Sequence, residues 1–366
     1  MKKIFILTNI PVPYKVDFYN ELGKKCDLTV VFEARRIDGQ KFNWNDNNEL
    51  SFNTIYLSDV LNEKVIHFKV AKFIKKKYFD LFLITTYHTF TGQFVLCLLK
   101  LYRLRYWFET DGAFVTNNEN RIKYWYKRFM IKGASLYLSP CVSSDNYLRN
   151  YGVRNETIHR YPFASTLFSE TLKKPLSKAE KIVLRKQLSI NSNKMIVAVG
   201  QFIRRKGFDV LIKAIADRDL ADVCCYIVGG EATAEYKNLI NKYNLHNIHF
   251  IKFLDRKALS CYYQASDIFV LPTREDIWGL VINEAMANGL PIITTTKCNA
   301  GLTLVNKDNG VLVDVDDIIG LRRAIKEIIY NDTALSKMGS SSIEKIQGYT
   351  IEKMAEAHNS LINNTL

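Results

Sequence analysis

The feature that most constrains this chain is a repeated alternation of short apolar runs with longer helix-like stretches. In the first half, strands are predicted at 3–8, 27–33, 80–85, 105–109 and 135–139, and helices at 14–23, 65–78, 91–102, 121–132 and 143–151. Strands that are apolar throughout and separated by helices indicate a parallel sheet covered on both faces.

A second series of the same kind follows an interruption of the pattern. Residues 160–193 contain Pro162, Pro175 and a lysine-rich stretch without a clear strand, which places the interdomain linker near 165–175. Strands are then predicted at 195–199, 223–228, 247–251, 267–271, 291–295 and 311–315, and helices at 207–217, 232–243, 256–264, 279–288 and from 317 onward.

We therefore expect an α/β protein with two doubly wound, Rossmann-like domains that face each other across a cleft. The domains are expected at 1–165 and 176–345, and a terminal helix at 346–366 is expected to cross back to the first domain. In such folds ligands bind at the carboxyl ends of the strands.

Composition excludes several other classes of protein. The 366 residues suit two domains, and 48% hydrophobic with 24% charged residues is typical of a globular chain and excludes a disordered one. The seven cysteines have no zinc-type spacing, so we expect reduced thiols in the cytoplasm. Because no apolar stretch reaches the length of about 18 residues that a span requires, no membrane-spanning helix is expected.

The charge of the chain is strongly positive and uneven. The formal net charge is +14, and residues 1–165 hold 25 basic and 15 acidic side chains. This excess suggests an anionic partner, which could be a phosphate-bearing ligand, a membrane surface or nucleic acid. Residues 121–132 combine five basic and four aromatic residues, which favours an interfacial membrane helix. Residues 64–77 carry six lysines and no acid, and there a solvated face is as good an explanation.

The most informative stretch is 266–296. Its strand is followed by a polar loop with Glu275 and Asp276, and then by a helix that begins at Gly279. The first-turn N–H groups of such a helix bind anions, and glycine lets a phosphate approach the backbone. Glu284 lies in an otherwise apolar helix, where a charge needs polar partners such as sugar hydroxyls. The alternative is that the acids cap the helix and that Glu284 meets a buried arginine.

A second informative stretch, 195–217, places a strand before Gly200 and a basic cluster before the next helix. Arg204, Arg205 and Lys206 are the cluster, and cations at a helix start oppose the helix dipole unless an anion neutralises them. A diphosphate would do so, whereas the alternative is a solvated basic loop. The chain has neither a dinucleotide-binding glycine motif nor a P-loop.

These two stretches resemble glycosyltransferase family 4 (glycosyl transferases group 1), whose members have the two-domain GT-B fold. Residues 276–285, DIWGLVINEA, resemble the family block in which two glutamates are separated by seven residues. Residues 199–207, VGQFIRRKG, resemble its upstream block. Here Asp276 replaces the first glutamate, unless Glu275 takes that role, and Gln201 replaces the usual arginine.

The resemblance implies a retaining hexosyltransferase that needs neither metal nor cofactor. The donor would be a nucleotide-diphosphate sugar, by default a UDP-sugar. The acceptor would be lipid-linked or a saccharide, in synthesis of a surface polysaccharide such as capsule, of lipopolysaccharide or of a glycolipid. A DxD-like run at 314–316 is not expected to bind metal.

By position, the resemblance also implies roles for individual residues. Glu284 would bond the nucleotide ribose, Asp276 the donor-sugar hydroxyls, and Lys206 the leaving diphosphate. The remaining donor-binding candidates are Gly200, Arg204, Arg205, Ile251, Phe253, Glu275, Trp278, Gly279, Leu280 and Val281. The candidate catalytic residues are Asp276, Lys206 and His88.

In the first half, polar residues after predicted strands are candidates for acceptor binding. His88 and Tyr87 follow strand 80–85, Glu109 and Asp111 end the next strand, and Tyr14 lies in the first loop. Lipid-linked acceptors would place the protein in the cytoplasm, peripherally on the inner face of the cell membrane.

Two other functions remain possible from sequence. One is a nucleotide-sugar epimerase with the GT-B fold. The other is a basic nucleic-acid-binding module, against which the absence of helix-turn-helix, RNP and zinc patterns argues.

Overall fold

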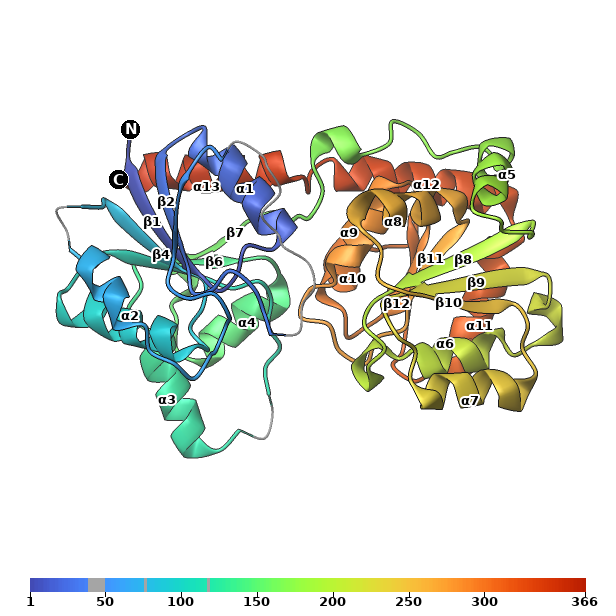
Figure 1. Ribbon diagram of the computed structural model, residues 1–366, viewed down its shortest axis with the longest axis horizontal. Helices are drawn as coiled ribbons and strands as arrows, with labels where there is room; N and C mark the ends of the chain where they lie inside the picture. The colour runs from blue at the N-terminus through green and yellow to red at the C-terminus, as the bar shows by residue number, and fades with distance from the viewer. Residues whose placement is uncertain (39–49, 76–77, 117–118) are drawn as a thin grey trace. The chain divides into compact units, whose positions relative to one another are not determined.

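The computed structural model describes residues 1–38, 50–75, 78–116 and 119–366. The chain forms two compact units (Figure 1). The first domain comprises Met1–Leu167 together with Thr350–Leu366, and the second comprises Phe168–Tyr349. The first crossing between the units thus falls within the stretch 165–175 that the sequence suggested as a linker.

The first domain is built on a parallel sheet of seven strands in the order β3-β2-β1-β4-β5-β6-β7. The strands are β1 Lys3–Thr8, β2 Asp27–Phe32, β3 Asn53–Tyr56, β4 Leu81–Ile84, β5 Tyr106–Glu109, β6 Leu136–Ser139 and β7 Ile158–Arg160. The helices are α1 Pro13–Gly23, α2 Phe90–Leu101, α3 Arg121–Ile131, α4 Val142–Asn150 and α13 Ile351–Thr365. Strand order reverses between β1 and β4, which is where doubly wound sheets bind ligands.

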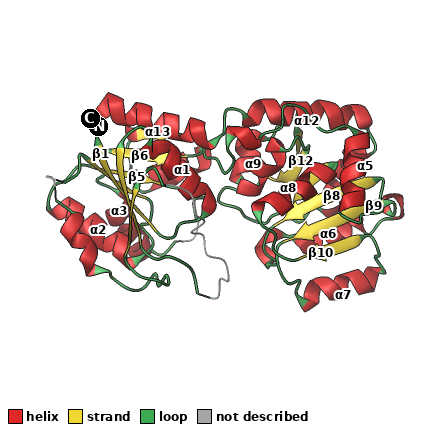
Figure 2. Cartoon of the chain, turned by 45° about the horizontal axis from the view of Figure 1, so that its top comes forward, coloured by secondary structure: helices red, strands yellow, loops and turns green. Residues whose placement is uncertain are grey.

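The second domain has a parallel sheet of six strands in the order β10-β9-β8-β11-β12-β13. The strands are β8 Lys194–Val199, β9 Val223–Val228, β10 Ile248–Ile251, β11 Ile268–Leu271, β12 Ile292–Thr295 and β13 Gly310–Val313. The helices are α5 Lys178–Gln187, α6 Phe208–Ile215, α7 Ala234–Tyr243, α8 Arg256–Ala265, α9 Leu280–Ala287, α10 Asn299–Leu304, α11 Ile318–Ile329 and α12 Asp332–Ile346. In each domain helices flank the sheet (Figure 2).

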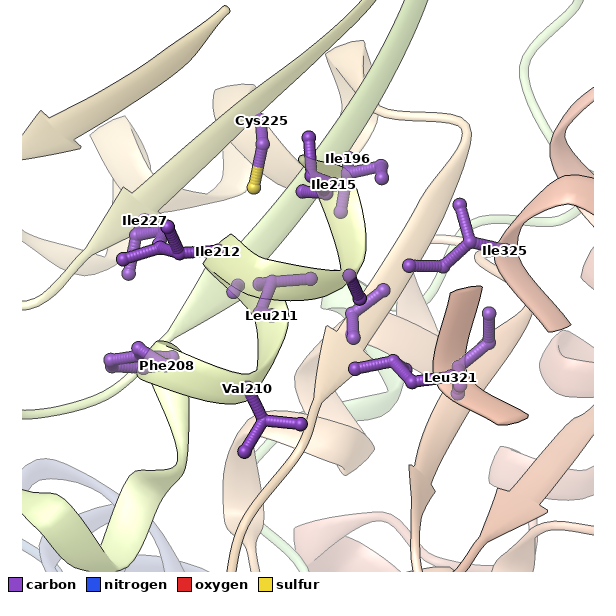
Figure 3. Close-up of a cluster of buried hydrophobic side chains, with 14 of the residues drawn as sticks. Ile196, Phe208, Val210, Leu211, Ile212, Ile215, Cys225, Ile227, Leu321 and Ile325 are labelled. Atoms are coloured by element: carbon purple, nitrogen blue, oxygen red, sulfur yellow. The ribbon is translucent and has the colours of Figure 1, made fainter. Parts of the chain in front are cut away.

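The core of the second domain lies between the sheet and helices α6 and α11 (Figure 3). Ile196 of β8 and Cys225 of β9 are fully buried beneath Leu211 and Ile215 of α6. Apolar side chains are spaced three and four residues apart on α6, so one face of the helix covers the strands. This packing holds the start of α6, and the loop before it, at the carboxyl edge of the sheet.

Helix α13 belongs to the first domain, although it ends the chain. It packs against α1, and the amide of Ile351 donates to the carbonyl of Thr166 at 3.0 Å. His358 on α13 is buried against the rings of Phe18 and Tyr161. The ends of the chain lie together, because Lys2 Nζ donates to the carbonyl of Leu366 at 3.0 Å (Figure 1).

Several local predictions differ from the structure. The helix expected at 65–78 is reduced to a short 3₁₀ turn, Phe68–Phe73, and residues 76–77 lie outside the described residues. Its lysines leave no continuous apolar stripe to pack, which explains the loss of the longer helix. Strands β3 and β7 and helix α10 were not predicted, since each is too short to show a clear period.

Among the described residues, no helix has both the length and the apolar character needed to cross a membrane. The fold class expected from sequence, two doubly wound α/β domains, is confirmed.

A buried ion-pair cluster joins the amino end of the second sheet to α5. Asp267 bonds Arg185 Nη2 at 2.7 Å, lies 3.7 Å from Lys181 Nζ, and accepts from the amide of Met195 at 2.8 Å. We predict that Asp267→Ala lowers the free energy of unfolding by about 3–5 kcal/mol, because two buried cations lose their counterion. Urea unfolding measures this.

The matched control is Asp332→Ala, which removes an exposed carboxylate paired with Lys194 at 2.8 Å. Its cost should stay below about 1 kcal/mol, as for other surface ion pairs. Equal losses in the two variants would contradict the assignment of Asp267 to the core.

Candidate functional site

The carboxyl edge of the second sheet brings together the loops that follow β8, β9 and β11. The β8 and β9 loops touch, because a Cβ on Gly229 would lie only 1.7 Å from the carbonyl oxygen of Gly200. Gly207 is equally tight against the β11 loop, since a Cβ there would lie 2.0 Å from the carbonyl oxygen of Pro272. Gly207 also has a left-handed backbone, with φ 69°. Both positions therefore require glycine.

Lys206 and Asp276 form the central ion pair of this edge. The Nζ and Oδ2 atoms are 2.5 Å apart, and both side chains are largely buried. Arg205 lies nearby, donating from Nη1 to the carbonyl of Glu275 at 2.7 Å and lying 3.7 Å from Asp276 Oδ1. Sequence analysis assigned the neutralisation of this basic cluster to a diphosphate, whereas the structure shows that Asp276 neutralises Lys206.

Arg274, which sequence analysis did not select, ties the two loops together. Its guanidinium bonds both carboxylate oxygens of Asp209, at 2.9 and 2.8 Å, and donates to the carbonyl of Arg204 at 2.6 Å. It also pairs with Asp316 at 2.8 Å, and its amide donates to the carbonyl of Arg205 at 2.7 Å. An arginine next to the acidic block was the available signal, but nothing local names Asp209 as its partner.

The turn before α9 has the backbone geometry expected from sequence, but the side chain of Trp278 in this turn does not lie where it was expected. Gly279 has φ 101°, and a Cβ there would lie 2.7 Å from Cys298 Sγ, so glycine is required. Trp278 was expected to contact the donor, yet its side chain is only 2% exposed and its Nε1 donates to Asn283 at 2.9 Å. The Trp278 side chain is therefore part of the core, because the indole needs apolar surroundings and one acceptor.

The first turn of α9 follows Gly279 with Leu280 and Val281. Amides of a first helical turn point out of the helix end and favour negative charge. Gly200 begins the facing β8 loop, with its amide donating to the carbonyl of Val228 at 2.9 Å. The start of α9 lies close to the Lys206–Asp276 pair, because a Cβ on Gly279 would be 3.7 Å from Asp276 Cγ.

Glu284 accepts a hydrogen bond from a tyrosine, and an arginine lies near enough for its charge to act on the carboxylate. Tyr263 of α8 donates its hydroxyl to Glu284 Oε2 at 2.9 Å. Burial raises the pKa of Glu284 to about 7, although the Tyr263 bond and the charge of Arg256 act in the opposite direction. Arg256 itself pairs with Glu170 at 2.6 Å. A carboxyl of this kind is suited to bonding hydroxyl groups.

The residues expected near a nucleotide base lie at the end of β10. The carbonyl of Ile251 accepts the amide of Gly229 at 3.0 Å, and the ring of Phe253 is about half exposed. Glu275 is exposed, and its carbonyl is held by Arg205 and by Thr273 Oγ1. Among the described residues, no group of three or more His, Cys, Asp or Glu side chains is arranged to hold a metal ion.

The first domain has a polar edge of its own, at the carboxyl ends of β1 and β5. Tyr14 donates to Asp111 Oδ2 at 3.4 Å. Lys15 was missed by sequence analysis, yet its buried ammonium lies 3.5 Å from Asp111 Oδ2, 3.2 Å from Thr8 Oγ1 and 3.4 Å from Asn9 Oδ1. A lysine in the first turn of a helix that follows a strand was the usable signal.

The other candidates of this edge differ in accessibility. Glu109 is buried, with Oε1 3.6 Å from Nε2 of His358, so its carboxylate is held within the protein. Tyr87 bonds its hydroxyl to that of Tyr147. His88 is exposed and lies 3.8 Å from Glu63, and partial burial lowers the pKa of its imidazole. His88 thus remains accessible in neutral form.

Glu33, directly after β2, was also missed by sequence analysis. It is fully buried, and its Oε1 accepts the hydroxyls of Thr86 at 2.9 Å and Thr89 at 2.6 Å. Burial raises the pKa of Glu33 to about 7. Because these threonines flank Tyr87 and His88, Glu33 holds the loop that presents His88.

Comparison with known families shows which proteins the second domain is similar to. Residues 180–345 match the family model described as glycosyl transferases group 1. Most of the second domain is therefore similar to group 1 glycosyl transferases, over a segment shorter than half of the chain. The resemblance of the blocks around Lys206 and Asp276 to glycosyl transferases group 1 is therefore confirmed.

Curated relatives of the chain include proteins named as glycosyltransferases. The chain is 30% identical over 174 residues to the D-inositol 3-phosphate glycosyltransferase of Corynebacterium diphtheriae, covering 44% of this chain and 40% of the relative. It is 27% identical over 173 residues to the lipopolysaccharide core biosynthesis glycosyltransferase LpsE of Rhizobium meliloti, covering 46% and 49%. The matches thus span half or less of these relatives.

Solved structures cover the whole chain. Sucrose-phosphate synthase from Thermosynechococcus elongatus superposes with a TM-score of 0.80 at 20% identity, covering 100% of this chain and 99% of that one. Anabaena HepE in complex with UDP gives 0.80 at 16% identity, with both chains covered completely. WaaG, a glycosyltransferase involved in lipopolysaccharide biosynthesis, gives 0.74 at 13%, covering 98% and 99%. These likenesses confirm the GT-B fold.

The Arg274–Asp209 pair should stabilise the loops of the second domain. We predict that Arg274→Met lowers the free energy of unfolding by about 1–3 kcal/mol, because a largely buried carboxylate loses two charged hydrogen bonds. The matched control is Asp316→Asn, which removes a more exposed partner of the same guanidinium and should cost less than about 1 kcal/mol. Chemical denaturation of both variants measures the difference, and a control as costly as Arg274→Met would contradict it.

Glu33 should make the stability of the first domain depend on pH. Its pKa is about 7 in the folded protein against a reference of 4.5, so the folded state binds the proton more tightly than the unfolded state. The stability contributed by the protonated form is complete below pH 4.5 and is lost as pH rises to 7. From the difference between the two pKa values, the free energy of unfolding should fall by about 3 kcal/mol over this range.

Glu33→Gln should flatten that segment of the stability profile, whereas Glu156→Gln, at an exposed carboxylate of the same domain, should leave it in place. Unfolding measured from pH 4 to pH 8 tests the difference. A profile of Glu33→Gln that matches the parent protein would refute the assignment.

Proposed function

We propose that this protein is a glycosyltransferase that moves a sugar from a nucleotide-diphosphate sugar to a saccharide or lipid-linked acceptor, with retention at the anomeric carbon. The match of residues 180–345 to group 1 glycosyl transferases supports the reaction type. A structural neighbour solved with UDP supports a UDP-sugar as the donor. Surface polysaccharide, capsule, lipopolysaccharide or glycolipid synthesis is the process we assign to it.

The Lys206–Asp276 pair beside the Gly279 turn carries this proposal. Breaking a sugar–phosphate bond places negative charge on the diphosphate. The Lys206 ammonium, Arg205 and the first-turn amides of α9 are donors fixed beforehand at one edge, which is what stabilises such charge. These groups supply the positive charge that the leaving diphosphate requires.

Asp276 has two tasks in this scheme. Without the diphosphate it neutralises Lys206, and with the donor bound it accepts a hydroxyl of the transferred sugar. Because both side chains are largely buried, the exchange keeps each charge partnered throughout. The carboxylate also places the sugar next to the cation that receives its leaving group.

Glu284 and Tyr263 would hold the nucleotide ribose. Glu284 already accepts from Tyr263, and its remaining carboxyl oxygen can bond a ribose hydroxyl. Phe253, about half exposed at the end of β10, would contact the base.

The acceptor would bind at the polar edge of the first domain. Tyr14, Lys15 and Asp111 are mutually bonded there, and His88 is accessible on the neighbouring loop. Hydroxyl-rich acceptors suit this mixture of donors and acceptors. Glu109 has no place in this role, because His358 and the core enclose it.

Helix α3 supports a lipid-linked acceptor and a peripheral position on the inner, cytoplasmic face of a membrane. Ile122 is 81% exposed, Trp125 63% and Phe129 58%, so the apolar stripe of this helix faces solvent and not the core. Basic residues interrupt the stripe. Exposed aromatic rings beside Lys and Arg are typical of helices that lie in the membrane interface.

We predict that Lys206→Ala lowers the rate of transfer by about 100- to 1,000-fold, as loss of one fixed electrostatic donor usually does. Purified protein is incubated with a panel of UDP- and GDP-sugars, with and without lipid extract, and nucleotide release is measured. The matched control is Lys194→Ala, at the opposite end of β8, where a similarly buried lysine is paired with Asp332. Lys194→Ala should keep the parent rate.

Turnover by Lys206→Ala at the parent rate would overturn the assignment of Lys206. Isomerisation of the sugar without transfer would identify an epimerase instead, and salt-sensitive nucleic-acid binding without turnover would identify a binding module.

A further inference from the structure

A basic cavity lies at the opposite end of the first sheet from the polar edge. It has a volume of about 430 Å³ and opens at the amino ends of β5 and β6. Its polar lining consists of Lys100, Arg103, Arg105, Tyr106 and Ser135. Gly133, between α3 and β6, also lines it. No acidic residue lines it, so three cations share one hollow without a counterion in its wall.

Lys100 is fixed in this cavity by helix α3. Its ammonium donates to the carbonyls of Phe129 and Met130, in the last turn of that helix. These bonds use two of its three hydrogens and leave one for a further acceptor. Burial lowers the pKa of Lys100 to about 8, and an anion in the cavity would favour the charged form.

Arg103 occupies a backbone position that does not suit a side chain. It ends helix α2 with φ 51°, a left-handed conformation for which glycine is the usual residue. Arg103 and Arg105 are both exposed. Within the described ranges, neither guanidinium lies at salt-bridge distance from a carboxylate.

Exposed apolar side chains lie next to Lys100, two of them in the sequence and one in space. Leu101 is 72% exposed and Tyr102 55% exposed, and both stand in the sequence between Lys100 and Arg103. The ring of Phe129 lies 4.4 Å from the Lys100 ammonium and continues the exposed stripe of α3. The cations are therefore bordered by groups that water solvates poorly.

We propose that this cavity binds the phosphate of an anionic phospholipid, while Leu101, Tyr102 and Phe129 enter the membrane interface around it. Two guanidinium groups and an ammonium match a phosphate in charge and in hydrogen-bond donors. The bordering aliphatic and aromatic groups match the boundary between headgroups and acyl chains. Nucleic acid would satisfy the cations but would leave Leu101 exposed.

The site extends the membrane association in the proposed function to a defined headgroup contact, and it rests on that association but not on sugar transfer. It would seat α3 and the first domain against the leaflet that holds a lipid-linked acceptor. Binding at the amino ends of the strands leaves the carboxyl edge, with Tyr14, Asp111 and His88, available to substrate.

The test uses the full chain and vesicles of phosphatidylcholine, alone or with 30% phosphatidylglycerol (about one lipid in three), in co-sedimentation at fixed ionic strength. The variant is Arg103→Gly with Arg105→Gln. Glycine suits the left-handed position, so the fold should persist, and circular dichroism checks it. The control, Lys24→Gln with Lys25→Gln, removes two exposed charges from the turn before β2.

The parent protein should bind the anionic vesicles and not the neutral ones. The arginine variant should lose affinity roughly 30-fold, whereas the control should lose no more than about threefold. Inorganic phosphate at matched ionic strength should compete with the vesicles, and this competition should disappear in the arginine variant.

Equal losses in the two variants would overturn the proposal, because general charge would then explain the binding. Saturable binding of inorganic phosphate without vesicle binding would assign the site to a free phosphate and overturn the lipid. Binding of RNA in preference to vesicles would do the same. Nucleotide release without vesicles is measured in parallel, so a failure of the proposed enzyme activity is distinguishable from a failure of the lipid site.

Discussion

The second domain depends on keeping buried charges partnered at the carboxyl edge of its sheet. Three cations follow β8 and two carboxylates follow β11, and neither loop could be buried alone with its charges unpaired. Two ion pairs supply the missing partners, because each joins the β8 side of this edge to the β11 loop. They are Lys206 with Asp276 and Arg274 with Asp209. The result is a rigid, charged edge in which the groups that would meet a diphosphate are already aligned.

The first domain uses polar burial differently. Glu33 and Glu109 both lie at the carboxyl ends of strands, yet both are buried and bonded within the protein. One holds the loop of His88, and the other faces α13, which returns from the end of the chain. The exposed groups of this edge are thus supported by two buried carboxylates.

Helix α3 is held to the first domain by its end, while its apolar stripe faces solvent. Only Met130 and Ile131, at its end, are buried, while Ile122, Trp125 and Phe129 face solvent. Lys100 holds this end through main-chain carbonyls, so the helix is anchored without its apolar stripe. The exposed apolar residues of α3 therefore do not serve to hold the helix on the protein.

Sequence alone determined the two doubly wound domains, because buried parallel strands must be apolar throughout and their helices amphipathic, and these periods are visible locally. It also indicated the blocks around Lys206 and Glu284, because a charged residue within an otherwise apolar helix, or a cluster of cations before a helix, is visible in the sequence. Only the tertiary structure decided that Asp276 partners Lys206, that Trp278 is in the core, that Tyr263 bonds Glu284, and that Glu109 is enclosed. The reason is physical: a period along the chain shows that a side chain is buried or charged, but its partner comes from another strand or helix, which only packing brings near.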